Sequence, residues 1–211
     1  IFCFGLAGAG DVDADGYNDL LMAHGTSNPN TESVYMLFGG PAMDGTVDMA
    51  LHPPEQAPVT PAGTSLNFGA SLSAAGDVNG DGFKDFLIGA PSDDPAFVAR
   101  AYVYTNTVTG TDIADRRLPG TGIDRAGTSV ALADMNGDGA ADILVGAWGE
   151  DGGATGRGRA YLYRGREAPS PGGGSLGWLQ WNEPTATLRG NVGERFGLAV
   201  ARAGDRNGDG Y

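Results

Sequence analysis

Short apolar runs alternate along this chain with clusters of Gly, Asp, Asn and Pro. The runs at residues 87–91, 101–104, 144–148 and 160–163 are rich in β-branched, aromatic or small apolar residues, and turn-forming residues bound them. Runs of about four to eight such residues are typical of β-strands. No stretch has the 3.6-residue period of an amphipathic helix. The pattern therefore predicts an all-β protein.

The runs belong to a repeat whose most regular part is an acidic loop. Copies of this loop begin at Asp11, Asp77, Asp134 and Asp205, so the repeating unit is a little over 60 residues long. Each unit has a small-residue stretch before the loop, an apolar run after it, a third run with aromatic residues, and a weaker fourth run. The fourth runs are expected at residues 46–49, 111–114 and 178–181, the last continuing to 187–188. Four strands in a unit of this length is the plan of a β-propeller blade.

The predicted fold is a partial β-propeller of about three four-stranded blades and the first strand of a fourth. Blade 1 is expected at residues 1–51, a Pro-rich linker at 52–65, blade 2 at 66–118, blade 3 at 119–189 and the start of blade 4 at 190–211. Propellers usually have four to eight blades, so we expect a piece of a longer protein that supplies the remaining blades. Gly89 and Gly146 stand in the middle of matching strands, which predicts a close approach of another backbone there.

Each acidic loop places oxygen-bearing side chains at alternate positions, an arrangement that suits Ca²⁺. This ion takes six or more oxygen ligands, which positions 1, 3, 5 and 9 supply from side chains and position 7 from its carbonyl. A glycine at position 6 permits the positive φ that turns these oxygens inward. The first loop has one more carboxylate than the second or third, so we expect it to bind most tightly. The expected ligands are Asp11, Asp13, Asp15, Tyr17 (carbonyl) and Asp19; Asp77, Asn79, Asp81, Phe83 (carbonyl) and Asp85; Asp134, Asn136, Asp138, Ala140 (carbonyl) and Asp142; and Asp205, Asn207 and Asp209 of an incomplete fourth loop.

Two other interpretations of the loops were compared with this one. An EF-hand loop has Glu at position 12 and opens a helix there, whereas Met22, Ile88 and Val145 stand at that position inside apolar runs. An EF-hand is therefore excluded. Clusters of Asp, Asn and Gly also form turns without any metal, and that alternative stays open, although the four carboxylates of the first loop repel one another unless a cation neutralises them.

Three motifs of the second unit carry a resemblance to a known family. They are Phe68-Gly69, the loop Asp77-Val78-Asn79-Gly80-Asp81-Gly82, and Gly89-Ala90-Pro91. With this spacing they resemble the FG-GAP repeats of integrin α-subunit-type β-propellers. The first unit lacks Phe-Gly and Gly-Ala-Pro, and the third has Ala126 for Phe and Trp148 for Pro. The resemblance implies a propeller of about seven blades that binds its ligand on the face opposite the calcium loops.

The charge balance limits the partners and the compartment. Lys and Arg number 13 against 26 Asp and Glu, a formal net charge of −13, which excludes general binding to nucleic acid or to anionic membranes. No apolar run is long enough for membrane insertion, and the single cysteine, Cys3, cannot form an internal disulfide. Weak calcium sites fill at extracellular calcium and stay empty in the cytosol. We therefore expect an extracellular protein, secreted or at the cell surface, with Ca²⁺ as its cofactor.

The expected function is a non-enzymatic binding or adhesion module. Its partner is expected to be a protein or a glycan on the face opposite the calcium loops. The loops 25–33, 91–99 and 148–159 and the linkers 52–65, 120–125 and 166–177 are expected on that face. His24 and His52 have no Ser or Cys nucleophile beside them in a recognisable setting, so neither a catalytic triad nor a zinc site is expected. Two alternatives stay open: the non-catalytic propeller part of a secreted, phospholipase D-like hydrolase, and a sugar-binding lectin. Trp178 and Trp181 could stack on a sugar, but residues three apart in a strand face opposite sides, which favours packing of one of them between blades.

Overall fold

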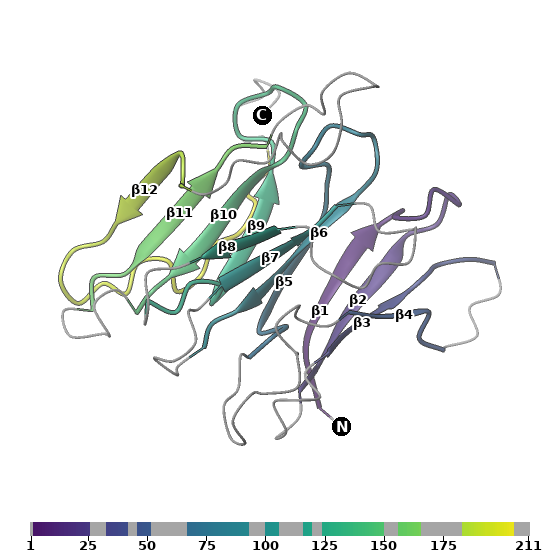
Figure 1. Ribbon diagram of the computed structural model, residues 1–211, viewed down its shortest axis with the longest axis horizontal. Helices are drawn as coiled ribbons and strands as arrows, with labels where there is room; N and C mark the ends of the chain where they lie inside the picture. The colour runs from purple at the N-terminus through teal and green to yellow at the C-terminus, as the bar shows by residue number, and fades with distance from the viewer. Residues whose placement is uncertain are drawn as a thin grey trace.

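The computed structural model describes residues 2–25, 33–41, 46–51, 67–92, 100–105, 116–119, 124–149, 156–165 and 183–204. In these ranges the strands form three four-stranded antiparallel sheets, which lie side by side along the molecule (Figure 1). Within the same ranges, no helix has the length and hydropathy needed to cross a membrane. The all-β prediction is confirmed, and the three sheets have the arrangement of neighbouring propeller blades.

Within each sheet the strands follow one another in chain order, as in an up-and-down blade. The first sheet contains β1 (Phe2–Gly10), β2 (Asp19–Gly25), β3 (Ser33–Leu37) and β4 (Met49–Leu51). The second contains β5 (Ser71–Gly76), β6 (Asp85–Ala90), β7 (Arg100–Tyr104) and β8 (Arg116–Pro119). The third contains β9 (Ser129–Ala133), β10 (Asp142–Ala147), β11 (Arg159–Tyr163) and β12 (Ala186–Arg189).

The fourth strand of the first sheet lies later in the chain than its apolar pattern predicts. Residues 46–48 are not in a strand, and β4 begins at Met49, which pairs with Met36. The reason is that Leu51 is fully buried opposite Val34, while the Asp48 carboxylate accepts the Phe38 N–H at 2.7 Å. The predicted runs at 111–114 and 178–181 lie outside the described residues, as does the linker at 52–65. The blade boundaries stay predictions.

The two central strands of the middle sheet, β6 and β7, are almost entirely buried, which explains their nearly continuous apolar runs. Along β6, Phe86, Ile88 and Ala90 belong to the hydrophobic cluster shared with the first sheet. The intervening Leu87 belongs to the cluster shared with the third sheet. Successive side chains of a strand point to opposite faces, so one strand supplies both interfaces, and every residue of β6 is buried.

The first strands of adjacent sheets contact each other: β5 lies against β1 of the first sheet and against β9 of the third. Here the prediction of a close backbone approach is confirmed: a Cβ on Gly89 would overlap the Gly127 carbonyl of the next sheet, and one on Gly146 would overlap the Gly197 carbonyl. The Ser71 hydroxyl also donates to the Gly127 carbonyl, at 2.8 Å. Glycine at these positions therefore lets one sheet dock on the next.

Candidate metal centres and the opposite end of the sheets

The three described acidic loops connect the first and second strands of their sheets and lie next to one another. The Ala141 N–H, at the end of the third loop, donates to the Asp77 carbonyl at the start of the second, at 2.6 Å. A Cβ on Gly10, just before the first loop, would lie 3.3 Å from Lys84 Cγ at the end of the second. All three loops are therefore at the same end of the sheets.

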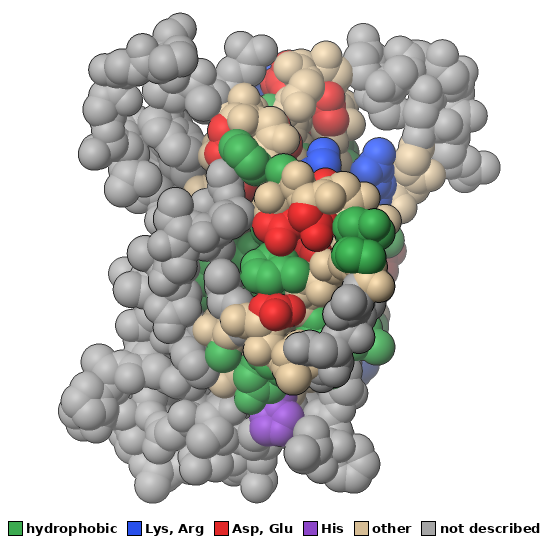
Figure 2. Space-filling view, turned by 90° about the vertical axis from the view of Figure 1, so that its right-hand side faces the viewer, with side chains coloured by type: hydrophobic (Ala, Val, Ile, Leu, Met, Phe, Trp, Pro, Cys, Tyr) green, Lys and Arg blue, Asp and Glu red, His purple; other side chains and the backbone are tan. Residues whose placement is uncertain are grey.

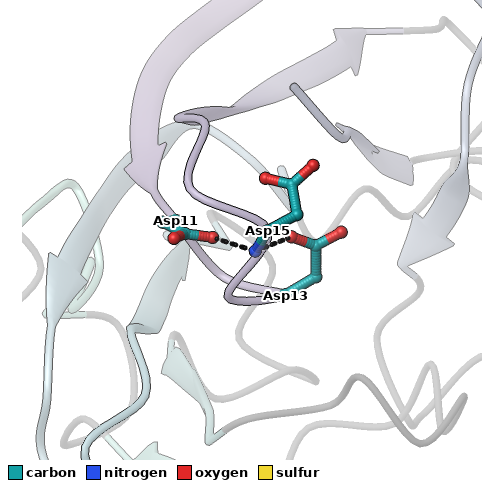
Figure 3. Close-up of side chains that lie close together, drawn as sticks. All are labelled: Asp11, Asp13 and Asp15. Atoms are coloured by element: carbon teal, nitrogen blue, oxygen red, sulfur yellow. Dashed lines mark hydrogen bonds between the residues drawn. The ribbon is translucent and has the colours of Figure 1, made fainter. Parts of the chain in front are cut away.

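The first loop gathers three carboxylates. One oxygen from each of Asp11, Asp13 and Asp15 lies within 4.8 Å of the others, and among the described residues this is the one group of three or more His, Cys, Asp or Glu close enough to share a metal. The Asp15 N–H holds two of these side chains in place, at 3.0 Å from Asp11 Oδ1 and 3.2 Å from Asp13 Oδ1 (Figure 3). The third carboxylate, that of Asp15, accepts a hydrogen bond from the Tyr17 N–H, which lies 2.8 Å from Asp15 Oδ1.

The other two loops repeat this pattern of bonds. The position-1 carboxylate accepts the N–H of the position-6 glycine at 2.8 Å in the second loop and 2.9 Å in the third, against 2.9 Å in the first. Asn79 and Asn136, at position 3, accept the position-5 N–H through their side-chain oxygens at 3.0 and 2.8 Å. In each loop, backbone N–H groups thus bind the side-chain oxygens of positions 1 and 3 and hold them on the inner side of the loop. The pattern is the same whether position 3 is Asp or Asn.

The position-9 carboxylates have a different environment from the other predicted ligands. Asp19, Asp85 and Asp142 are all buried, and Oδ2 of each accepts the N–H of position 2, at 2.6, 2.6 and 3.1 Å respectively. In the first and third sheets Oδ1 also accepts the N–H of Gly39 or Gly165, just beyond the third strand. These carboxylates therefore tie the loop to two strands, a role that the loop pattern alone does not reveal.

Burial and charge repulsion raise the pKa values of the loop carboxyls, whereas backbone N–H donors lower them. Burial raises the pKa of Asp13, and the negative charges of the other loop carboxylates raise it further. Burial also acts to raise the pKa of Asp134, but four backbone N–H donors outweigh it and hold the pKa below its ordinary value. Burial raises the pKa of Asp142, helped by the charges of Asp138 and Asp134. A bound cation would relieve the repulsion in each loop.

The position-7 residues differ between loops: Tyr17 and Phe83 are exposed, whereas Ala140 is buried.

Seen from the side on which the first sheet lies, acidic side chains gather in separate groups with hydrophobic side chains between them (Figure 2). Asp205, Asn207 and Asp209 of the fourth loop lie outside the described residues. Metal ligation by the loop residues stays a prediction.

The opposite end of the third sheet carries a cluster that the sequence pattern did not predict, although Trp148 and Arg125 belong to segments expected on the binding face. Trp148 directly follows β10, and the guanidinium carbons of Arg125 and Arg195 lie 4.3 and 5.4 Å from the centre of its ring. The sequence signal was the replacement of Pro by Trp in the third copy of Gly-Ala-Pro. Other residues expected at this end, at 26–32, 93–99 and 150–155, lie outside the described ranges, and so do Trp178 and Trp181.

Comparison with known proteins agrees with these repeats. Residues 77–145 match the family described as FG-GAP-like repeat. Integrin alpha-5 of Xenopus laevis is 28 % identical over 202 residues, which is 87 % of this chain and 18 % of that protein. Integrin alpha-10 of Homo sapiens is 31 % identical over 155 residues, 66 % of this chain and 12 % of the relative. Integrin alpha-4 of Xenopus laevis is 37 % identical over 106 residues, 47 % of this chain and 10 % of the relative.

Residues 77–145 thus match FG-GAP-like repeat sequence, and the predicted resemblance to the FG-GAP repeats of integrin α-subunits is confirmed. It spans less than a fifth of the length of these relatives.

Proposed function

We propose that this FG-GAP-type chain is a calcium-stabilised, extracellular β-propeller segment that acts as a binding or adhesion module without enzymatic activity. The observation that carries the proposal is the same bonding pattern in three acidic loops at one end of three adjacent sheets. A turn needs no carboxylates gathered on its inner side, whereas a cation site does.

The donor set of the loops fits a hard cation. Asp11, Asp13 and Asp15 supply three carboxylates with oxygens within 4.8 Å of one another, and the Tyr17 carbonyl and Asp19 complete the proposed set. The glycines at position 6 have φ between 90° and 93°, as a loop that turns its oxygens inward requires. All these ligand atoms are oxygen, which suits Ca²⁺ rather than a softer metal. Asp77 to Asp85 and Asp134 to Asp142 would hold further ions in the same way.

Calcium binding at these loops would add to the stability of a fold that has no internal disulfide. A site with a dissociation constant of about 0.1 mM at about 1 mM calcium adds roughly 1.4 kcal/mol. Three such sites add about 4 kcal/mol, a large part of the 5–15 kcal/mol typical of a domain. Since weak sites fill only outside cells, the proposal includes an extracellular location, which the integrin alpha relatives support.

The binding role rests on the same relatives and on the geometry of the blades. The acidic loops occupy one end of the sheets, so a protein or glycan ligand would use the opposite end, where the loops differ from one unit to the next. A glycan array and a screen of protein ligands on the same chain would distinguish a lectin from a protein receptor.

Thermal unfolding with excess calcium and with chelator tests the calcium part of the proposal. Calcium should raise the melting temperature by about 8–17 °C, since 1 kcal/mol corresponds to about 2–4 °C in a chain of this size. The triple variant Asp13→Ala, Asp81→Ala, Asp138→Ala should lose this rise. The control variant Asp93→Ala, Asp94→Ala, Glu183→Ala removes three acidic groups outside the loops and should keep it. A melting temperature that calcium does not change would show that the loops are ordinary turns.

A further inference from the structure

We propose that Arg125, Trp148 and Arg195 form a carboxylate-binding site for an acidic peptide segment, at the end of the third sheet opposite the acidic loops. The site deepens the binding role proposed above by naming where the partner attaches and what charge it carries.

The three residues come from separate parts of the chain and meet where the third sheet joins the next unit. Arg125 lies before β9, Trp148 follows β10, and Arg195 follows β12. Backbone bonds fix the position of Arg195, whose N–H donates to the Gly156 carbonyl at 2.7 Å. Two guanidinium groups are thereby held against one indole ring, at 4.3 and 5.4 Å from its centre.

Comparison with the second unit shows that the fold does not require these residue types. The residues before the Phe-Gly motif and its equivalents all have positive φ: 53° at Asn67, 58° at Arg125 and 49° at Arg195. Asn adopts this conformation readily, whereas a long side chain does so at a cost in backbone strain. In the second unit Pro91 stands where the third has Trp148. Arg therefore stands in the third unit and at the start of the fourth where the second unit has Asn, and Trp148 stands where it has Pro. Strained residues of this kind concentrate at functional sites.

The positive charge is local in a chain that is otherwise acidic. Residues 1–83 contain no Lys or Arg, and 12 of the 13 basic residues lie from residue 100 onward. Arg157 and Arg159 lie at this same end of the sheet: Arg159 is the first residue of β11, and Arg157 lies just before it. The acidic neighbours Asp124 and Glu194 each accept a hydrogen bond within the fold, from the Tyr161 hydroxyl at 2.8 Å and the Asn191 N–H at 2.7 Å, and both Asp124 and Arg125 have further contacts in the fold.

The geometry favours a carboxylate over a neutral sugar. A guanidinium that stacks on an aromatic ring keeps its N–H groups in its own plane, where they bind a carboxylate through two parallel hydrogen bonds. The Trp148 ring is occupied by guanidinium groups and so is not a free platform for a sugar. Repulsion from the remainder of this acidic chain disfavours binding of an acidic peptide away from this site.

Fluorescence anisotropy of a fluorescein-labelled hexaglutamate peptide, titrated with the 211-residue chain in low salt and 1 mM calcium, tests the site. The double variant Arg125→Asn, Arg195→Asn introduces the residue that occupies the same backbone conformation at Asn67, so the fold should be preserved. We expect this variant to bind at least tenfold more weakly, and Trp148→Ala several-fold more weakly. The control Arg164→Asn, Arg202→Asn makes the same change of charge elsewhere and should bind within twofold of the wild type.

The test is repeated in a second protein, the variant Glu150→Gln, Asp151→Asn. These two carboxylates follow Trp148 closely in the sequence, lie outside the described residues and could compete with the peptide for the arginines. Binding in the wild type or in Glu150→Gln, Asp151→Asn, lost when both arginines are replaced, supports the proposal. Binding in neither protein overturns it, as does binding that survives replacement of both arginines. Arginine-dependent binding of a heparin hexasaccharide without any binding of the peptide also overturns it, in favour of a sulfated glycan. The calcium-dependent melting temperature does not depend on these outcomes, so failure here is distinct from failure of the calcium proposal.

Discussion

Replacing Gly89 by Ala tests whether close contact between the second and third sheets stabilises the fold. The added Cβ would overlap two groups, the backbone carbonyl of Gly127 in the next sheet and the side-chain hydroxyl of Ser71. The carbonyl belongs to the backbone, so it moves only if the two sheets separate. The bond from the Ser71 hydroxyl to the Gly127 carbonyl, 2.8 Å long, would be disturbed by the same movement.

The expected loss of stability follows from these two contacts. Overpacking a well-packed interface by one methyl group costs about 1–3 kcal/mol, and loss of one hydrogen bond costs about 0.5–1.5 kcal/mol. Together they predict a destabilisation of about 2–4 kcal/mol. At about 2–4 °C for each kcal/mol, the melting temperature should fall by about 4–16 °C.

Thermal and urea unfolding of Gly89→Ala beside Gly8→Ala is the appropriate assay. Gly8 lies in β1, the strand of the first sheet equivalent to β5, and a Cβ there would meet no atom within 4 Å. Gly8→Ala should therefore be neutral or stabilising by about 0.4–1 kcal/mol, because alanine restricts the unfolded chain. If Gly89→Ala costs no more than this control, the reasoning about the contact between sheets is wrong.

The first sheet offers a natural compensating pair. Ala23 occupies the position of Gly89, and its partner in the register is Gly5 where the second sheet has Ser71. The double variant Ser71→Gly, Gly89→Ala should therefore recover part of the loss, with a coupling energy of about 0.5–3 kcal/mol in the double-mutant cycle. If the losses of stability in Ser71→Gly and Gly89→Ala simply add in the double variant, residues 71 and 89 do not share the contact argued here.

Three further predictions concern single groups. Ala14 has a φ of 63° where the other loops have glycine, so Ala14→Gly should raise the free energy of unfolding by about 0.5–1 kcal/mol in urea titrations; a loss would show that the loop is not strained there. Asn191 lowers the pKa of Glu194 through side-chain and backbone hydrogen bonds; Asn191→Ala should remove the side-chain contribution and raise the pKa toward its ordinary value in an NMR titration. The pair therefore stabilises the fold above the unfolded-state pKa of Glu194 and loses this effect as the pH falls through the lower folded-state value. Burial raises the pKa of Tyr163, so the folded protein retains this proton longer than the unfolded chain and loses stability as the pH rises above about 10; Tyr163→Phe should flatten this alkaline decline in melting temperature, and an unchanged slope would contradict the assignment.

The sequence alone determined the features that depend on local geometry. The strand runs were predictable because a strand buried on one or both faces needs apolar residues at fixed spacing, as in β6. The loops were predictable in the same way, since alternating Asp, Asn and Gly create bonds within five residues, such as that from Gly82 N–H to Asp77. The close approach at Gly89 was predictable because only glycine leaves room for it.

Tertiary structure decided the features that join distant segments. The start of β4 depends on which residues pair with β3, so the apolar run at 46–49 did not define it. The position-9 carboxylate reaches Gly165 only after the third strand has folded back beside the loop, 23 residues further along the chain. Arg125, Trp148 and Arg195 are spread over three connections and meet only when the sheets dock. Local pattern defines each strand and loop, but a contact across the fold depends on how the strands pair and pack.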